Sequence, residues 1–484
     1  MQDLDDGTIH VTSGRLRHGI MMPVLILGLL LSVLSQAAMT DELTDANSMV
    51  IFSRAKPTGA LIPSNCISDM GNDSCVDGDG LRGAAWITVS TDGQSAYVAS
   101  FDSSALAVFA RDPTTGLLTQ FVGVAGCIAQ LGDGVSCAAA NGILGAVSVA
   151  VTPDNKNLYV AARDGNTVAA FARDITTGTL TQLSGGAGCI AAAGNGVTCA
   201  NARALLGPRG IVISPDGMNI YVASRDSSAI AIFSRDTTTG VLTQLIGAAG
   251  CVSNDGSGGI CSQGKALAGV RGIAVSPDSK YVYVASQTAN AVAVFARDKI
   301  TGVLTQLSGI AGCIAENGDG VTCAYGRGLL APIHVDVSPD GKHVYVASRD
   351  SHSVAIFARN TKTGALTQLR GTAGCIAENG DDVTCASGRG LNEAVYVAVS
   401  PDGKNVYVAS QVSDAVAEFA RNTKTGALVQ LAGLTGCVSQ DGALESCTDA
   451  NGLDGTVALT VSPDGRYLYA VSFNSNAVTI FNRN

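Results

Sequence analysis

The chain has 484 residues and a formal net charge of −10, and 46% of its residues are apolar while only 14% are charged. Phosphate binding requires clustered Lys and Arg, so the acidic balance and the lack of any basic run exclude a nucleic-acid partner. The 58 glycines and the low share of charge favour short buried strands joined by tight turns over amphipathic helices.

An apolar run near the N-terminus has the features of an export signal. Residues 20–34 are apolar, Arg15 and Arg17 precede them, and Ser35 and Ala37 have the spacing of a signal-peptidase site. These features predict a signal peptide that is cleaved near Ala37. The alternative is an uncleaved signal anchor, although the run is shorter than the roughly 20 apolar residues that span a bilayer comfortably. Either form predicts an extracytoplasmic protein (secreted, periplasmic or at the cell surface), with membrane contact only through an uncleaved anchor.

The cysteines reveal an internal repeat, because the 14 of them fall into seven pairs and, from Cys127 onward, each pair follows the last by 62 residues. The pairs are Cys66/Cys75, Cys127/Cys137, Cys189/Cys199, Cys251/Cys261, Cys313/Cys323, Cys375/Cys385 and Cys437/Cys447. An even count, local pairing and an exported chain predict seven disulfides, each within one loop. A metal cage needs further ligands at the same loop. Calcium needs about 6 to 8 oxygen ligands, more than loops with Asp319 or Asp381 and Asp382 provide, so neither metal nor cofactor is predicted.

The same strand pattern recurs around each cysteine pair. One repeat has an apolar strand that runs into a turn (IAVSPDS, 273–279), then a second strand (YVYVAS, 281–286) and a third (AVAVFARD, 291–298). A Thr-Gly turn then leads to a short fourth strand (LTQL, 304–307). Alternating β-branched and aromatic residues between such turns indicate strands. Pro and Gly explain the Ser-Pro-Asp-Gly and Thr-Gly turns by geometry alone. Seven four-stranded repeats predict an all-β fold, a seven-bladed β-propeller.

The two ends of the chain predict how the ring closes. A solenoid is the competing architecture, but its terminal repeats are expected to be polar caps. Here residues 48–62 look like third and fourth strands, and the chain stops after a third strand at residues 477–481. We therefore expect residues 59–62 to supply the missing outer strand of the last blade. The predicted organisation is a signal peptide (1–37), a linker (38–47) and a propeller (48–484).

The repeat also resembles a known family. YVAS followed by AVAVFARD and a Thr-Thr-Gly turn resembles the YVTN-type propellers, and the whole repeat is similar to bacterial lactonase-family β-propellers, which include exported relatives with paired cysteines. The resemblance runs from Met49 to the C-terminus. It implies the propeller fold strongly and an activity only weakly, since one fold hosts many functions.

One position early in the first strand of each repeat varies between copies, and we expect it to line the central channel on the face that carries the cysteine loops. Its occupants are Trp86, Ser148, Gly210, Gly272, His334, Tyr396 and Ala458. Arg209 and Arg271 precede it in two copies, Glu393 replaces a usual Gly, and Asp336 lies deeper in the strand. Large rings beside the two glycines predict a pocket with bulk on one side and space on the other.

These residues suggest roles in lactone opening. His334 is the candidate general acid or base, Arg209 and Arg271 the candidate oxyanion stabilisers, and Glu393 a further catalytic candidate. Trp86, Tyr396 and Asp336 are candidate ligand contacts. Within the resemblance, PIHVDVSPDG (332–341) places His334 in the lactonase Pro-x-His position. GPRGIVISPDG (207–217) keeps Arg209 but has Gly210 where the family has His, and Ser stands where lactonases often have Glu after the second strand.

Two functions therefore remain open. The leading prediction is an exported recognition or cell-surface module that binds a protein, a glycan or a small anionic ligand without chemistry. The alternative is a lactonase-like hydrolase that opens a small anionic lactone at the channel mouth, so whether the chain is an enzyme stays undecided. The candidate residues could also simply fill a wide channel. The tips Arg163-Asp164, Arg225-Asp226 and Arg349-Asp350 are expected to be solvated hairpin ends.

Overall fold

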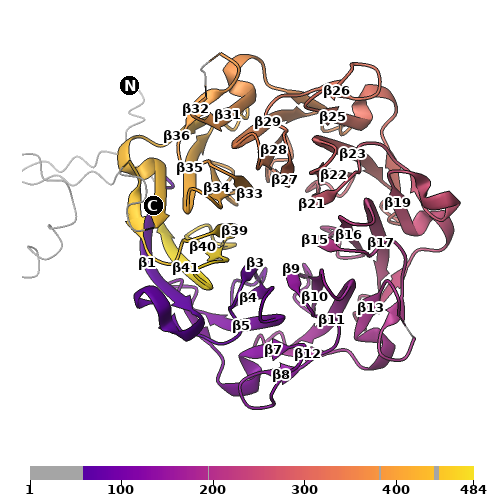
Figure 1. The fold of residues 1–484 in the computed structure, drawn as a ribbon, viewed down its shortest axis with the longest axis vertical. Helices are drawn as coiled ribbons and strands as arrows, with labels where there is room; N and C mark the ends of the chain where they lie inside the picture. The colour runs from indigo at the N-terminus through magenta and orange to yellow at the C-terminus, as the bar shows by residue number, and fades with distance from the viewer. Residues whose placement is uncertain (1–57, 195, 381–382, 441–445) are drawn as a thin grey trace, which may run out of the picture. The chain divides into compact units, whose positions relative to one another are not determined.

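The computed structural model describes residues 58–194, 196–380, 383–440 and 446–484. The chain divides into two units, Met1–Thr58 and Gly59–Asn484. Within the described ranges the second unit is a ring of seven sheets, a seven-bladed β-propeller, as predicted (Figure 1). The predicted signal peptide and linker lie outside the described residues. No helix in the described part of the chain is long and apolar enough to cross a membrane.

Each blade is built on three long antiparallel strands that run from the channel outward. The inner strands are β3 (Ala84–Val89), β9 (Ala146–Val151), β15 (Pro208–Ile213), β21 (Val270–Val275), β27 (Pro332–Val337), β33 (Ala394–Val399) and β39 (Thr456–Val461). The second strands are β4 (Ser95–Ser100), β10 (Asn157–Ala162), β16 (Asn219–Ser224), β22 (Tyr281–Ser286), β28 (His343–Ser348), β34 (Asn405–Ser410) and β40 (Tyr467–Ser472). The third strands are β5 (Ala105–Arg111), β11 (Thr167–Arg173), β17 (Ala229–Arg235), β23 (Ala291–Arg297), β29 (Ser353–Arg359), β35 (Ala415–Arg421) and β41 (Ala477–Arg483).

The fourth position of a blade is shared by two short strands, because the predicted Leu-Thr-Gln strand pairs only with the end of the third strand. These strands are β6 (Leu118–Gln120), β12 (Leu180–Gln182), β18 (Leu242–Gln244), β24 (Leu304–Gln306), β30 (Leu366–Gln368) and β36 (Leu428–Gln430). A strand that starts at the first cysteine pairs with the beginning of the third strand. These are β7 (Cys127–Ala129), β13 (Cys189–Ala191), β19 (Cys251–Ser253), β25 (Cys313–Ala315), β31 (Cys375–Glu378) and β37 (Cys437–Gln440).

The cysteine loop then returns as a short parallel strand at the blade's outer edge. These strands are β8 (Ala138–Ala139), β14 (Ala200–Asn201), β20 (Ser262–Gln263), β26 (Ala324–Tyr325), β32 (Ala386–Gly388) and β38 (Thr448–Ala450). Short 3-10 turns occur beside the cysteine strands and loops. They are η1 (Asp69–Ser74), η2 (Gly123–Ala125), η3 (Gly185–Ala187), η4 (Gly247–Gly250), η5 (Gly256–Gly259), η6 (Gly309–Gly312), η7 (Gly371–Gly374) and η8 (Gly433–Gly436).

The N-terminal strand closes the ring, as the ends of the chain predict. Strand β1 (Leu61–Ser68) pairs antiparallel with β41, from Leu61 opposite Arg483 to Ser68 opposite Ala477, and β2 (Val76–Asp77) pairs parallel with β1. The observed pairing extends beyond the predicted residues 59–62, because β1 replaces both short outer strands of the other blades. A bulge between Pro63 and Asn65 stands where the other blades have a connecting loop.

All 14 cysteines lie in described residues and form seven disulfides with the predicted partners, so none is free. The bridges are Cys66–Cys75, Cys127–Cys137, Cys189–Cys199, Cys251–Cys261, Cys313–Cys323, Cys375–Cys385 and Cys437–Cys447. Each bridge stays within one loop, at a sequence separation of 9 or 10 residues. Disulfides persist in oxidising compartments, so this set fits an extracytoplasmic environment.

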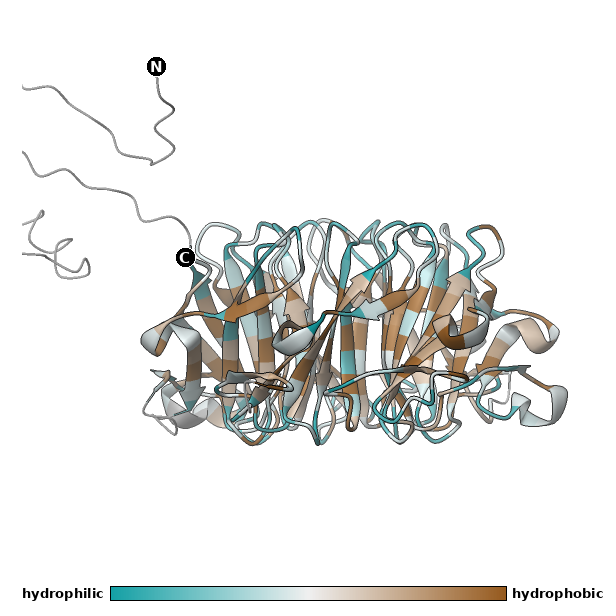
Figure 2. Ribbon diagram, turned by 90° about the horizontal axis from the view of Figure 1, so that it is seen from above, coloured by the Kyte–Doolittle hydropathy of each residue, from teal (hydrophilic) through white to brown (hydrophobic). Residues whose placement is uncertain are grey.

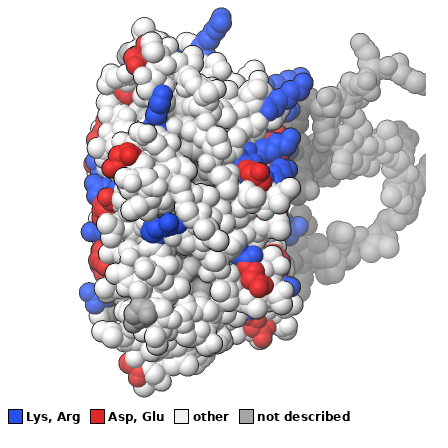
Figure 3. Space-filling model, turned by 90° about the vertical axis from the view of Figure 1, so that its right-hand side faces the viewer, with Lys and Arg blue, Asp and Glu red and all other residues white. Residues whose placement is uncertain are grey.

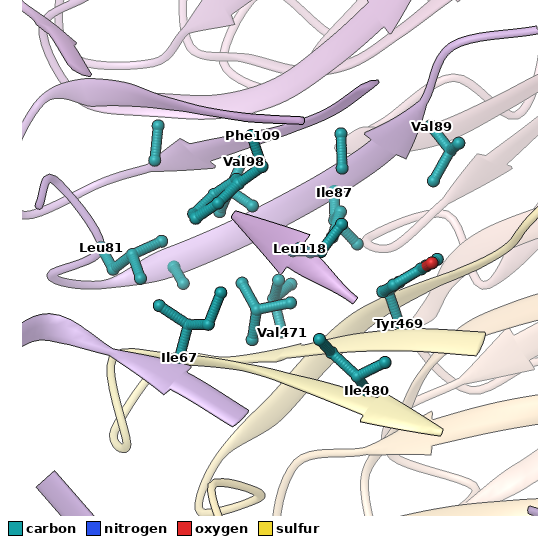
Figure 4. Close-up of a cluster of buried hydrophobic side chains, with 14 of the residues drawn as sticks. Ile67, Leu81, Ile87, Val89, Val98, Phe109, Leu118, Tyr469, Val471 and Ile480 are labelled. Atoms are coloured by element: carbon teal, nitrogen blue, oxygen red, sulfur yellow. The ribbon is translucent and has the colours of Figure 1, made fainter. Parts of the chain in front are cut away.

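Apolar clusters fill the spaces between neighbouring blades. Between the seventh blade (β39–β41 with β1) and the first (β3–β8), Ile67 and Ile480 pack against Ile87, Val98 and Phe109 (Figure 4). Seen from the side, the brown apolar parts of the strands lie midway between the two faces of the ring, whereas the turns on both faces are more hydrophilic (Figure 2). The second and third strands, such as β4 and β5, are largely apolar and buried at nearly every residue, so both sides of each sheet have to be covered.

A repeated ionic contact also joins neighbouring blades. Arg173 of β11 donates from Nε to the Tyr97 hydroxyl of the preceding blade at 2.6 Å, and Tyr97 donates to the Gly178 carbonyl. The same guanidinium lies 3.0 Å from the Asp92 carboxylate. The equivalent ion pairs are Arg111–Asp464, Arg235–Asp154, Arg297–Asp216, Arg359–Asp278, Arg421–Asp340 and Arg483–Asp402. The sequence suggested only a turn-forming role for these aspartates. In the structure they also form ion pairs that join neighbouring blades.

The hairpin tips and the loops before the inner strands share one face of the ring. The Asn166 side chain, at the tip after β10, accepts a hydrogen bond from the Gly207 N–H just before β15 of the next blade. The Asn476 side chain and the Gly83 N–H make the same contact across the closure. Viewed from the rim, most charged side chains lie along the two edges where the faces begin (Figure 3).

Candidate functional site

A cavity of about 270 Å³ lies at the channel mouth on the tip face. The first residues of the inner strands form its floor, and the tips after the second strands form its wall. The residues that line it are Ala85, Trp86, Phe101, Val147, Arg163, Arg209, Arg271, Gly272, Ile333, His334, Arg349, Val395, Tyr396, Gln411, Val457 and Phe473. Five of the predicted residues, namely Trp86, Arg209, Arg271, His334 and Tyr396, therefore share one cavity.

Three rings from different blades meet at the floor. His334 of β27 stacks on Tyr396 of β33 with ring centroids 3.7 Å apart, and the Trp86 ring of β3 meets both edge-on at 5.5 and 5.0 Å. The same rings also line a second cavity deeper in the channel. The aromatic cluster therefore separates the mouth cavity from the rest of the channel, and such pairs add stability beyond the area they bury.

The side chains of His334 and Asp336 also form hydrogen bonds with the backbone of the neighbouring inner strand, β33. The His334 Nδ1–H donates to the Val397 carbonyl at 3.1 Å, and the Asp336 carboxylate accepts from the Val399 N–H at 2.8 Å. Both partners belong to the open inner edge of β33, where no further strand can pair. Burial lowers the pKa of His334 to about 3 and raises the pKa of Asp336 to about 6. His334 is therefore neutral at pH 7, and the tautomer that donates from Nδ1 leaves Nε2 unprotonated. Asp336 lies below the aromatic cluster and lines the deeper cavity.

The two inner arginines form a poorly compensated positive centre. Burial and the charges of neighbouring arginines lower the pKa of Arg209 to about 10 and that of Arg271 to about 9. The Arg209 Nε–H is buried and has no hydrogen-bond acceptor among the described residues. Arg271 donates to the Gln287 side chain at 3.3 Å and has no ion pair in the described structure. A buried guanidinium without an anion is costly, so this centre is suited to an anionic ligand.

The tip arginines differ from the expectation of solvated hairpin ends. Arg163 and Arg349 line the mouth cavity, although each also pairs with its neighbouring aspartate. The Arg349 Nε–H lies 2.7 Å from the Asp350 carboxylate, and the Arg163 guanidinium lies 4.9 Å from the Phe101 ring centroid. Arg225, at the same tip position, does not line the cavity.

Glu393 does not line the mouth cavity. It adopts a left-handed φ of 56° one residue before β33, and its N–H donates to the His352 ring. A Cβ placed on Gly145 or Gly207, which occupy this position in other blades, would meet the tip aspartate of the same blade. The side chain at this position therefore leaves towards the tip and not towards the channel.

The two channel glycines do not provide free space, contrary to the sequence-based expectation. A Cβ on Gly210 would lie 2.4 Å from the Arg271 carbonyl, and one on Gly272 would lie 2.7 Å from the His334 Cα. The glycines instead let β15, β21 and β27 approach closely. Gly272 still lines the cavity, together with the arginines and the aromatic rings.

The disulfide cysteines lie apart from the mouth cavity, and none of them lines it. In six blades the second cysteine of the bridge stands directly before the short parallel strand at the outer edge. These cysteines are Cys137, Cys199, Cys261, Cys323, Cys385 and Cys447, and Cys75 stands in the same way before β2. Their first partners start the strands that pair with the third strands, or lie in β1 for Cys66. The bridges therefore fasten the outer edges of the blades and take no part in the chemistry of the mouth.

Two cavity residues of a distinct kind were missed. Phe101 and Phe473 follow the second strands of the first and seventh blades and line the mouth. The same comparison between copies finds them, because the other occupants of this position are polar. They are Arg163, Arg225, Gln287, Arg349 and Gln411. At this position only the Arg-Asp pairs were interpreted from the sequence, as solvent-exposed charge.

The described residues contain no cluster of three His, Cys, Asp or Glu side chains that could hold a metal ion. Asp319, one of the loop carboxylates considered for calcium, accepts the N–H groups of Val321, Thr322 and Cys323. These hydrogen bonds lower the pKa of Asp319 and explain its place in the loop. Asp381 and Asp382 lie outside the described residues.

Fold and site together define a disulfide-bonded seven-bladed β-propeller with a cationic, aromatic-floored cavity at one mouth of its channel. A family model described as "Lactonase, 7-bladed beta-propeller" matches residues 136–253, 263–313 and 324–377. The matched residues lie within the propeller, and the chain is similar to this family there, as its strand motifs indicated. No curated protein matches the chain.

Several solved structures are similar to this chain. A candidate 6-phosphogluconolactonase from Bacteroides uniformis is 22% identical with a TM-score of 0.48, covering 71% of this chain and 82% of its own. A periplasmic gluconolactonase from Pseudomonas aeruginosa is 18% identical with a TM-score of 0.48, covering 71% and 83%. Hydrazine synthase from Kuenenia stuttgartiensis is also 18% identical with a TM-score of 0.48, covering 84% and 97%.

Proposed function

We propose that this protein is an extracytoplasmic hydrolase that opens a small anionic lactone in the mouth cavity. The observation that carries the proposal is the pair Arg209 and Arg271, which face the cavity with lowered pKa values and no carboxylate partner of their own. An anionic substrate would relieve this electrostatic cost on binding. The match to the lactonase family model supports the lactone as the reacting group.

The chemistry follows from the charges around the cavity. Water attacks the lactone carbonyl carbon, the carbonyl oxygen gains negative charge, and the arginines stabilise that charge. The ring C–O bond then breaks, the ring oxygen leaves as a hydroxyl after taking up a proton, and the other product group is a carboxylate. His334 is neutral, so its Nε2 can orient the attacking water and accept its proton. A pKa near 3 makes it a weak base, so most of the rate is assigned to the arginines.

The test is hydrolysis of γ- and δ-lactones with and without a carboxylate or phosphate group, followed by acid release at constant pH. Arg271→Met and Arg209→Met are expected to lower kcat/KM for the anionic lactones by about 100-fold, and His334→Gln by about tenfold. The control is Arg466→Met, which removes an exposed charge from the opposite face. Activity that survives all three cavity substitutions, or a wild-type protein that opens none of the lactones, rejects the proposal.

Binding without chemistry is the second candidate, and one observation favours it. The His334 Nδ1 and the Asp336 carboxylate are both engaged with the edge of β33, which gives these residues a structural role. Under this alternative the arginines hold an anionic ligand that is not consumed. Lactones that bind with unchanged affinity in His334→Gln but are never opened by the wild type would support the binding module over the hydrolase.

A further inference from the structure

The mouth cavity has two chemically different walls. Arg209, Arg271 and Arg349 come from the third, fourth and fifth blades and form a cationic wall. Phe101 and Phe473 come from the first and seventh blades, which are neighbours across the ring closure, with ring centroids 6.4 Å apart. In Figure 1 the inner strands β3 and β39 of these two blades lie across the channel from β15 and β21. A ligand in the cavity therefore meets positive charge on one side and aromatic surface on the other.

The aromatic wall is held in place by its surroundings. The Arg163 guanidinium lies over the Phe101 ring at 4.9 Å, a cation–π distance. On another side the backbone is close, because a Cβ on Gly145 would lie 3.0 Å from the Phe101 ring. Both rings are partly buried and keep part of their surface for the cavity. A fixed apolar surface of this kind binds with a small loss of side-chain freedom.

The rest of the lining favours an apolar group over a hydroxylated one. Val147, Val395 and Val457 extend the aromatic wall, and Trp86 lies beneath it. Among the described lining residues, Gln411 is the only side-chain amide and none is Ser, Thr, Asp, Asn or Glu. Specific recognition of several hydroxyl groups requires neutral or acidic hydrogen-bonding side chains, and this lining offers few of them, mainly Gln411, His334 and Tyr396.

We infer that the ligand is an amphipathic anion, with its carboxylate or phosphate on Arg209 and Arg271 and an aromatic or short alkyl group on Phe101 and Phe473. This inference rests on the proposed anion site and adds which kind of anion that site prefers. Phe101 and Phe473 are then specificity-determining residues, and the blades next to the closure are the ones that distinguish this cavity from a purely ionic site. As a substrate class, it corresponds to an acidic lactone that carries an apolar substituent.

Three small molecules test the contributions of the two walls separately, namely acetate, phenylacetate and the uncharged phenylacetamide. Titration calorimetry of the full propeller is expected to show phenylacetate binding at least about tenfold more tightly than acetate, because the phenyl ring leaves water. Phenylacetamide is expected to bind at least about tenfold more weakly than phenylacetate, because it lacks the charge. Phe101→Gln with Phe473→Gln, which places the residue of two other blades at both tips, should reduce phenylacetate binding to the level of acetate and change acetate binding by less than about twofold.

The outcomes distinguish the inference from the proposed function. Equal affinities of wild type for acetate and phenylacetate overturn the amphipathic ligand and leave the anion site intact. Phenylacetamide binding as tightly as phenylacetate, or no binding of either carboxylate, overturns the anion site and the inference with it. Unchanged phenylacetate affinity in the double variant assigns the apolar group elsewhere and also overturns the inference. The wild-type comparison decides the matter even if the double variant fails to fold.

Discussion

At the scale of single residues, the channel contains ionisable side chains whose charged form is disfavoured by burial or by neighbouring charges of the same sign. Arg271 lies among other arginines, and burial disfavours the charged form of Asp336 in the narrow channel. Such groups reduce stability unless a ligand or a hydrogen bond compensates them, and they concentrate at functional sites. Within the described residues Arg271 makes one side-chain hydrogen bond, to Gln287, whereas Asp336 accepts hydrogen bonds from two backbone N–H groups.

Asp336 makes the stability of the fold depend on pH. Its folded pKa of about 6 exceeds the usual 3.8, so the folded state holds the proton more tightly than the unfolded state. The free energy of unfolding should therefore fall as the pH rises from about 4 to 6, by up to about 3 kcal/mol for this group. Asp336→Asn cannot ionise, so its stability relative to wild type should increase over that range. Denaturant titrations at pH 4, 5, 6 and 7 measure this, and a difference that stays constant with pH would contradict the assignment.

At the scale of the strands, β1 is the element on which closure depends. It is the only described outer strand that reaches its blade from the other end of the chain. It is held by its pairing with β41, and the Cys66–Cys75 bridge ties it to the start of β2 within the same N-terminal segment. A buried carboxylate marks its docking site. Glu418 of β35 accepts the Leu61 N–H at 2.8 Å, whereas the same position in the other blades is apolar. Burial raises the pKa of Glu418 well above its usual value. Glu418 belongs to the sixth blade, so the blade next to the closing one carries the residue that distinguishes it from the other copies.

The disulfide at β1 is expected to matter more than an equivalent disulfide elsewhere. Cys66–Cys75 and Cys313–Cys323 close loops of nearly equal length, so chain entropy gives both about 2 to 3 kcal/mol. Losing the first bridge should in addition loosen the N-terminal segment that forms β1 and β2, so that β1 frays more readily and exposes the edge of β41. Cys66→Ser with Cys75→Ser should thus lower the melting temperature more, and promote more association on size-exclusion chromatography, than the matched pair at Cys313 and Cys323. Equal effects of the two double variants would show that β1 stays docked without its bridge.

At the scale of the whole molecule, the repeated Arg–Asp ion pair runs around the complete ring. Arg111 and Asp464 join the first blade to the seventh at 2.9 Å, and Arg297 and Asp216 join two blades consecutive in sequence at 2.8 Å. The two arginines are almost fully buried and the two aspartates about 30% exposed, so their surroundings match. In a closed ring the contact between the first and seventh blades should therefore stabilise the fold as much as the contact between two blades that are consecutive in sequence.

Double-mutant cycles test that equivalence. Arg111→Met with Asp464→Asn, and Arg297→Met with Asp216→Asn, should give equal coupling energies of about 1 to 3 kcal/mol. The exposed pair Arg225–Asp226, 3.4 Å apart at a tip, is the control and should give less than about 1 kcal/mol. A coupling at Arg111 and Asp464 that matches the control, while the other pair couples strongly, would mean that the ring opens between the first and seventh blades.

The sequence alone determined what depends on local pattern and period. The repeated cysteine pairs predicted the disulfides. The recurring strand patterns predicted a propeller. The incomplete repeats at the two ends of the chain predicted that the N-terminal strand closes it, because the last blade lacked an outer strand. Comparing copies at one position also brought Trp86, His334 and Tyr396 together. Only the tertiary structure decided directions and distances. It turned Glu393 towards a tip, closed the space beside Gly210, and brought Arg163, Phe101 and Phe473 into the mouth, because these outcomes depend on how closely neighbouring blades approach and on backbone angles that residue spacing does not encode.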